Sequence, residues 1–120
     1  MYESQTVLEA TGQIIIGIYF IWMGAKNILL WDMNVKRTSA EGLPPVPTLL
    51  FGFTIQFTGA FLVLTDWNAK YGAILLIFFT ILASSLFHRY WEMPNPSRRT
   101  YHFLLLTNNC AIVGGLLLLI

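Results

Sequence analysis

Four long runs of apolar residues, separated by short polar segments, make up almost the whole chain. The runs cover residues 7–31, 47–66, 69–91 and 100–120. A helix needs about 20 mostly apolar residues to cross the hydrocarbon core of a bilayer, and each run meets that length. The alternating pattern of a membrane β-strand is absent from them. The pattern therefore predicts one domain, residues 1–120, that is an all-α integral membrane protein with a four-transmembrane-helix antiparallel bundle.

The segments between the runs contain residues that end one helix and begin the next. The first segment, DMNVKRTSAEGLPPVP, is polar and then rich in proline. It predicts a short surface helix at about 33–41, which Gly42 ends, and a next helix with Pro47 in its first turn. The second segment, TDWNAK, fits a tight hairpin in which Thr65 or Asp66 caps the following helix. In the third, EMPNPSRRTYH, Asn95-Pro96 is a typical helix start.

Composition favours a membrane protein over a soluble one. Hydrophobic residues make up 56% of the 120 residues and charged residues only 11%, whereas a soluble domain carries about a quarter charged residues. The lipid bilayer is therefore the expected partner. The net charge of +1 provides no basic field, so nucleic acid is not an expected partner. The single cysteine, Cys110, excludes an internal disulfide or a dithiol pair.

Basic residues gather at one predicted end of the bundle. The first and third connecting segments contain Lys36, Arg37, Arg98 and Arg99, whereas the opposite end contains Lys70 alone. Lys and Arg are enriched in the cytoplasmic loops of membrane proteins. The pattern therefore predicts that these two segments are cytoplasmic and that both termini are outside.

Small and polar residues interrupt the apolar runs at helical spacing and form one stripe on each helix. One interpretation is structural, because small residues let membrane helices approach closely and amides join them by hydrogen bonds. The other is that the amides of Gln56, Asn108 and Asn109 line a small polar pocket inside the bundle. The members of the stripes are Gln13, Gly17, Gly24, Gly52, Gln56, Gly59, Thr80, Ser84, Ser85, His88, Glu92, Asn108, Asn109, Ala111 and Gly115.

Ionisable residues lie near the cytoplasmic ends of the first and third predicted helices. His88 and Glu92 are four residues apart, so they share a helix face, and Lys26 is expected at a similar depth, within reach of Glu92. Such residues often mark a functional site, but at helix ends they also serve as polar caps. Both roles stay open. A metal site with His102, or a haem between the two histidines, is disfavoured because the spacing lacks a recognised motif.

Four stretches, taken in order, resemble the DoxX family (DoxX/DoxD-like) of small four-helix membrane proteins of bacteria and archaea. They are GIYFIWMGAKNI, GLPPVPTLLFGFTIQFTGAFLVLTDW, FHRYWEMPNP and NNCAIVGGLLLL. Lys26, Gly42, Pro44, His88 and Trp91 occupy the positions of the family motifs. The resemblance implies a multi-pass protein of the bacterial or archaeal cell (inner) membrane that is associated with a respiratory or redox system. This chain has Gln56 where the family usually has a glutamate, and an amide cannot accept a proton.

Two hypotheses of function follow. In the first, the protein binds quinone or a small ligand in a polar pocket at the cytoplasmic end of the bundle, and a partner carries the electrons. The candidate cofactor-binding residues are Lys26, Gln56, His88, Trp91, Glu92 and Asn109. In the second, it is a non-catalytic accessory subunit that packs against other membrane protein subunits or against itself. Neither assigns a catalytic residue, a metal or a haem. Solute transport is less favoured, because repeats and broken helices are absent.

Overall fold

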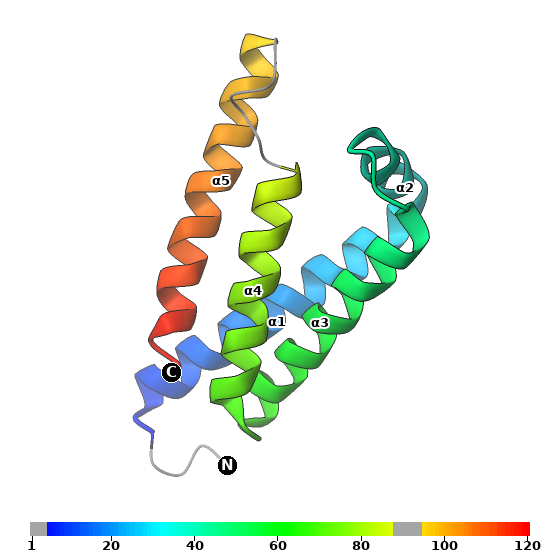
Figure 1. Cartoon of the computed structure of the whole chain (residues 1–120). Coiled ribbons are helices and arrows are strands. Elements are labelled where there is room, and N and C mark those ends of the chain that lie inside the picture. The colour runs from blue at the N-terminus through cyan, green and yellow to red at the C-terminus, as the bar shows by residue number, and fades with distance from the viewer. Residues whose placement is uncertain (1–4, 88–94) are drawn as a thin grey trace.

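The computed structural model describes residues 5–87 and 95–120. Within them the chain forms the helices α1 (Val7–Leu29), α2 (Trp31–Ala40), α3 (Pro45–Thr65), α4 (Ala69–Phe87) and α5 (Pro96–Leu117). The four long helices alternate in direction, and the short α2 lies at one end (Figure 1). The start of α1 and the end of α5 lie at the opposite end. The predicted all-helical class is confirmed.

The observed helix bounds differ from the predicted ones by a few residues. The first helix ends at Leu29 and not at Trp31, because the chain turns at Leu30 and Trp31 already begins α2. The next helix begins at Pro45, two residues before Pro47. The last begins at Pro96 and not at residue 100. The Asn95 side chain caps it there by accepting hydrogen bonds from the backbone N–H groups of residues 97 and 98.

Two of the four predicted spans meet the requirement for a membrane helix by their own length and composition. These are α1 and α3, whereas the apolar part of α4, Ala69–Ser85, is shorter. The end of the third predicted helix, residues 88–91, lies outside the described residues. The described residues therefore contain two candidate spans, and the four-span bundle becomes part of the proposal made below.

The central helix of the bundle is α3, which packs against α1, α2 and α4, while α5 packs against α4. The buried apolar core consists of Phe20, Ala60, Val63, Ala73, Leu76 and Leu116. Most of these residues come from the last turns of α3, the first turns of α4 and the end of α5. The core therefore lies toward the end of the bundle that is opposite α2 (Figure 1).

Glycines allow the helices to approach closely at this core. A Cβ atom built on Gly72 of α4 would lie 2.7 Å from the carbonyl oxygen of Gly59 on α3, and one on Gly59 would lie 3.0 Å from the carbonyl oxygen of Gly72. Gly17 of α1 receives the side chain of Leu64, whose Cγ would lie 2.5 Å from an added Cβ. The close-packing interpretation of Gly17 and Gly59 is confirmed.

A hydrogen-bonded amide of α1 holds the end of α3. The buried Gln13 donates from Nε2 to the carbonyl oxygen of Val63, at 2.8 Å, and to Oδ1 of Asp66, at 2.9 Å. Gln5 donates in turn to Oε1 of Gln13, at 2.7 Å. Asp66 has the left-handed backbone conformation, with φ 54°, and is the residue that ends α3. The last carbonyl groups of a helix need such partners when they are buried.

Candidate functional site

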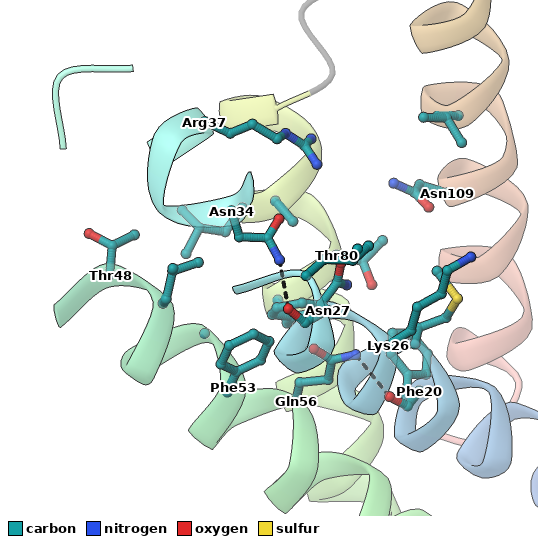
Figure 2. A pocket seen from close by; sticks show the side chains of 18 of the residues that line it. Phe20, Lys26, Asn27, Asn34, Arg37, Thr48, Phe53, Gln56, Thr80 and Asn109 are labelled. Carbon is teal, nitrogen blue, oxygen red and sulfur yellow. Dashed lines mark hydrogen bonds between the residues drawn. The ribbon is translucent and has the colours of Figure 1, made fainter. Parts of the chain in front are cut away.

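A cavity of about 370 Å³ lies toward the α2 end of the bundle, and all the described helices contribute to its wall. Its volume is within the range of pockets that hold small molecules. Helices α3 and α4 touch at Gly59 and Gly72, near the opposite end of the bundle. Because they diverge from that contact, they leave space for the cavity at the α2 end. Figure 2 shows the side chains of 18 of the residues that line it.

Most of the cavity wall is apolar. The rings of Phe20 and Phe79 come from α1 and α4 and meet edge to face, with centroids 6.4 Å apart. Phe53 of α3 adds a third ring, and Leu105 and Ile112 of α5 also line the cavity. Such a wall favours the hydrocarbon or ring part of a ligand.

The amide of Gln56 is the most deeply buried polar group of the cavity wall, with 2% of the residue exposed. Its Nε2 donates to the carbonyl oxygen of Phe20 on α1, at 2.8 Å (Figure 2). Its Oε1 is buried and has no hydrogen-bond donor among the described residues. An acceptor in that state costs about 1–3 kcal/mol. A buried acceptor on the wall of a cavity is a group that a donor from a bound molecule would satisfy.

Helix α2 covers one end of the cavity through a polar face. Asn34 donates from Nδ2 to the carbonyl oxygen of Asn27 on α1, at 2.8 Å (Figure 2), and Thr38 donates to the carbonyl oxygen of Asn34, at 2.8 Å. Asn34 and Thr38 are four residues apart and both buried. Their shared face holds α2 against the bundle.

Positive charge enters the cavity from two helices. Arg37 of α2 and Lys26 of α1 both line it, and Figure 2 shows their side chains extending toward the side that α5 forms. Burial, and then the positive charge of Arg98, lower the pKa of Arg37 from its ordinary value, while Tyr101 and Glu41 act in the opposite direction. The guanidinium nevertheless stays charged.

Helix α5 is joined to α4 at the cavity by a side-chain hydrogen bond. Asn109 donates from Nδ2 to Oγ of Ser84, at 2.9 Å. Asn109 also lines the cavity, so the two interpretations of this amide, interhelical bond and pocket lining, apply together. Its neighbour Asn108, and Ala111 of the same stripe, are exposed on the outer face of α5. The inward position that the stripe predicted, whether for interhelical bonding or for lining the pocket, is therefore wrong at these two residues.

Three of the six candidate residues, Lys26, Gln56 and Asn109, line the same cavity. The other three, His88, Trp91 and Glu92, lie outside the described residues, and so does the expected ion pair between Lys26 and Glu92. The predicted inward stripe of α4 is narrower than expected. Thr80 and Ser84 are buried, but Ser85 is exposed and donates to the carbonyl oxygen of Ile81, because successive residues of a helix point about 100° apart.

Several lining residues were not among the candidates, namely Asn27, Asn34, Arg37, Thr48 and Tyr101. The spacing of Asn34 and Thr38 could have indicated a buried polar face on the surface helix. Arg37 was interpreted only as a determinant of membrane orientation. Within the described part of the chain, no three His, Cys, Asp or Glu side chains are grouped so that they could hold a metal.

Comparison with known proteins places the chain beside one protein of Escherichia coli (strain K12). It is 24% identical over 117 residues to the inner membrane protein YphA, and the aligned region covers 97% of this chain and 83% of that protein. No protein-family model and no solved structure matches the chain. The similarity and the two apolar helices long enough to cross a bilayer support a helical membrane protein.

Proposed function

We propose that the chain is a four-span inner-membrane protein that binds a membrane-soluble small molecule in the cavity between its helices. One observation carries the ligand-binding part. The cavity combines an aromatic wall with convergent polar groups, and one of them, Oε1 of Gln56, is a buried acceptor that no described group satisfies. Pockets that bind small molecules have this combination of an apolar wall and a few polar groups.

The four-span part is supported by the outer surface of α4 and α5. Phe78 and Ile81 of α4 are 51% and 54% exposed, and Phe103 and Leu104 of α5 are 46% and 54% exposed. Trp22 of α1 is 70% exposed. An apolar surface that extends over helix after helix is unfavourable in water and suits contact with lipid. The basic residues near α2 favour a cytoplasmic location for that end.

A quinone is the ligand that the resemblance to the DoxX family implies, and the protein would then serve a respiratory or redox membrane system. Quinone carbonyl groups accept hydrogen bonds, which Lys26 and Arg37 can donate at the polar end of the cavity. The hydroxyl groups of the reduced form, the quinol, are the donors that Oε1 of Gln56 lacks. The quinone ring would lie against Phe20, Phe53 and Phe79. A partner subunit or a bound cofactor would exchange electrons with it, because amino-acid side chains of this kind do not.

Cavity-filling variants test the ligand-binding proposal. Ala83 of α4 lines the cavity, so Ala83→Phe would occupy part of its volume. Ala111→Phe, on the exposed face of α5, is the matched control. We expect mass spectrometry of the gently extracted protein to find a quinone or another amphiphile with the wild type and the control, and much less with Ala83→Phe. Equal amounts on all three proteins would contradict the proposal.

The outer face of α5 favours a second candidate, a non-catalytic accessory subunit of a larger membrane complex. Asn108, Cys110 and Gly114 are exposed there, and a Cβ atom on Gly114 would meet nothing within 4 Å. An amide and small residues on a membrane-facing surface are typical of helix–helix contacts. Asn108→Leu should release a co-purifying protein if this candidate is right, whereas the cavity variants should not.

A further inference from the structure

The side-chain amide of Gln56 has a fixed orientation on the cavity wall. Its Nε2 donates to the carbonyl oxygen of Phe20, at 2.8 Å, and its Oε1 is buried without a donor among the described residues. Exchanging the two ends of the amide would set Oε1 against that carbonyl, and two acceptors cannot share a hydrogen bond. Figure 2 shows the oxygen on the side of the amide that faces away from Phe20. The wall therefore presents an acceptor to the molecule that fills the cavity.

The neighbouring polar side chains of the wall do not supply the missing donor. Thr80 of α4 donates to a carbonyl oxygen of its own helix, at 2.8 Å. Asn34 donates to a carbonyl oxygen of α1, and Asn109 donates to Oγ of Ser84. Each of the three thus uses a donor within the protein and keeps an oxygen that can accept. The need of Gln56 for a donor remains, whether or not the two cations of the cavity have partners.

This acceptor lies among aromatic rings. Phe53 is three residues before Gln56 on α3, so the two side chains share a helix face, and both line the cavity. Phe20, whose carbonyl group holds the amide, meets Phe79 edge to face at 6.4 Å. Aromatic rings favour contact with the edge or the offset face of another ring. A flat ring that has a hydroxyl group at its rim satisfies the rings and the acceptor together.

We propose that the ligand of this cavity is an aromatic alcohol, whose ring hydroxyl donates to Oε1 of Gln56 and whose ring lies against the phenylalanines. The site then binds such a ring in preference to the same ring without the donor. This inference rests on the proposed function and adds the hydrogen-bonding character of the ligand. Applied to a quinone, it means that the site selects the reduced form, the quinol, over the oxidised form. A quinol of the membrane and a phenol with one hydroxyl group share this chemistry.

Native mass spectrometry of the full chain in a non-ionic detergent, under anaerobic conditions, tests the inference with matched probes. Para-decylphenol and para-decylanisole have the same ring and chain, and the anisole has a methyl group in place of the donor hydrogen. We expect the phenol to bind about tenfold or more tightly, because only the phenol satisfies the buried acceptor. A decyl-substituted quinol should exceed the corresponding quinone by a similar factor. Quinol binding at least as tight as that of the phenol identifies a membrane quinol as the ligand, and weaker quinol binding identifies a phenol with one hydroxyl group.

Variants show whether the preference arises at Gln56. Gln56→Leu should bind the phenol and the anisole about equally, because leucine has no acceptor. Asn108→Leu is the matched control, since it makes the same change from an amide to leucine on the outer face of α5, and it should keep the full preference. Ala83→Phe should weaken the binding of both probes, because it fills part of the cavity. Retained binding of the anisole by Gln56→Leu shows that this variant is folded.

The possible failures are distinguishable. Equal affinity of the wild type for the phenol and the anisole overturns the aromatic alcohol, even if a variant misfolds, but leaves the ligand-binding proposal intact. A preference that Gln56→Leu retains in full has the same consequence, because the donor is then recognised elsewhere. Failure of every probe to bind the wild type, the quinone and the anisole included, overturns the proposed function itself.

Discussion

The contact between Gly59 and Gly72 makes a sharp prediction about stability. In Gly72→Ala, the new Cβ would lie 2.7 Å from the carbonyl oxygen of Gly59, 2.8 Å from Cβ of Leu62 and 3.1 Å from Cγ2 of Val63. Ordinary contact begins at 3.4 Å, so the closest pair is about 0.7 Å too close. Two of these three atoms are a backbone oxygen and a Cβ, which move only if a helix moves.

The magnitude follows from two opposing effects. Overpacking a close contact costs about 1–3 kcal/mol, and more where backbone must shift. Replacing glycine by alanine inside a helix contributes about 0.5–1 kcal/mol of stability. We therefore expect Gly72→Ala to lose about 1–2 kcal/mol of the free energy of unfolding, and more if a helix must shift. Gly12→Ala and Gly114→Ala, where a Cβ would meet nothing within 4 Å, should gain about 0.5–1 kcal/mol.

Unfolding of the purified protein by sodium dodecyl sulfate, followed by circular dichroism, provides the measurement. The three alanine variants make the same chemical change at helical positions, so the difference between them reports the local space. The reasoning is refuted if Gly72→Ala is as stable as Gly114→Ala. A uniform loss at all three positions would indicate that helix flexibility, and not close packing, decides the effect of glycine in this protein.

Three further predictions concern other parts of the bundle. Gln13→Met should destabilise the protein by about 1–3 kcal/mol, because its hydrogen bonds are lost. A double-mutant cycle with Asp66→Gly, a substitution that tolerates the positive φ, should show coupling between the two positions. Additive effects would contradict the hydrogen bond between Gln13 and Asp66. Gln56→Leu should change the free energy of unfolding by less than about 1 kcal/mol, because it removes a hydrogen bond and an unsatisfied acceptor together; a loss of more than about 3 kcal/mol would contradict this balance. Cys110, which lies well inside α5, should resist a membrane-impermeant maleimide in sealed vesicles until detergent is added. As a control, Ser39→Cys in a Cys110→Ala background should react from the cytoplasmic side. Rapid labelling of Cys110 would contradict the four-span proposal.

The helices themselves were predictable because their signals are local. A run of apolar residues, a proline in the first turn and a capping asparagine such as Asn95 act on neighbouring residues, so the sequence indicates them directly. Gly42, which has φ 79°, likewise follows the predicted surface helix. The sequence also predicts a break between the first helix and the surface helix, at residues 31–33, and the structure has it at Leu30. The exact position has no local signal, because residues 28–31 are all apolar and include no glycine or proline. That break depends on the long-range packing of α2 against α3.

The same distinction applies to the site. Lys26, Gln56 and Asn109 belong to polar stripes that the helical period brings to the inside, and the structure places all three on one cavity. Arg37 and Asn34 line it for a different reason. They belong to α2, whose position over the cavity follows from tertiary contacts that no local pattern shows. A charge that only marks orientation and a charge that lines a cavity look alike in a sequence.

The hairpin of α3 and α4 has a consequence for biogenesis. Its turn is short, with Asp66 and Asn68 both at φ 54°, and its two helices touch through backbone at Gly59 and Gly72. In the four-span arrangement proposed above, such a hairpin would enter the bilayer as a unit once both helices have left the ribosome. Helix α5 is synthesised later and joins mainly through α4. Because α5 forms part of the cavity wall, the proposed ligand site is complete only after α5 has docked.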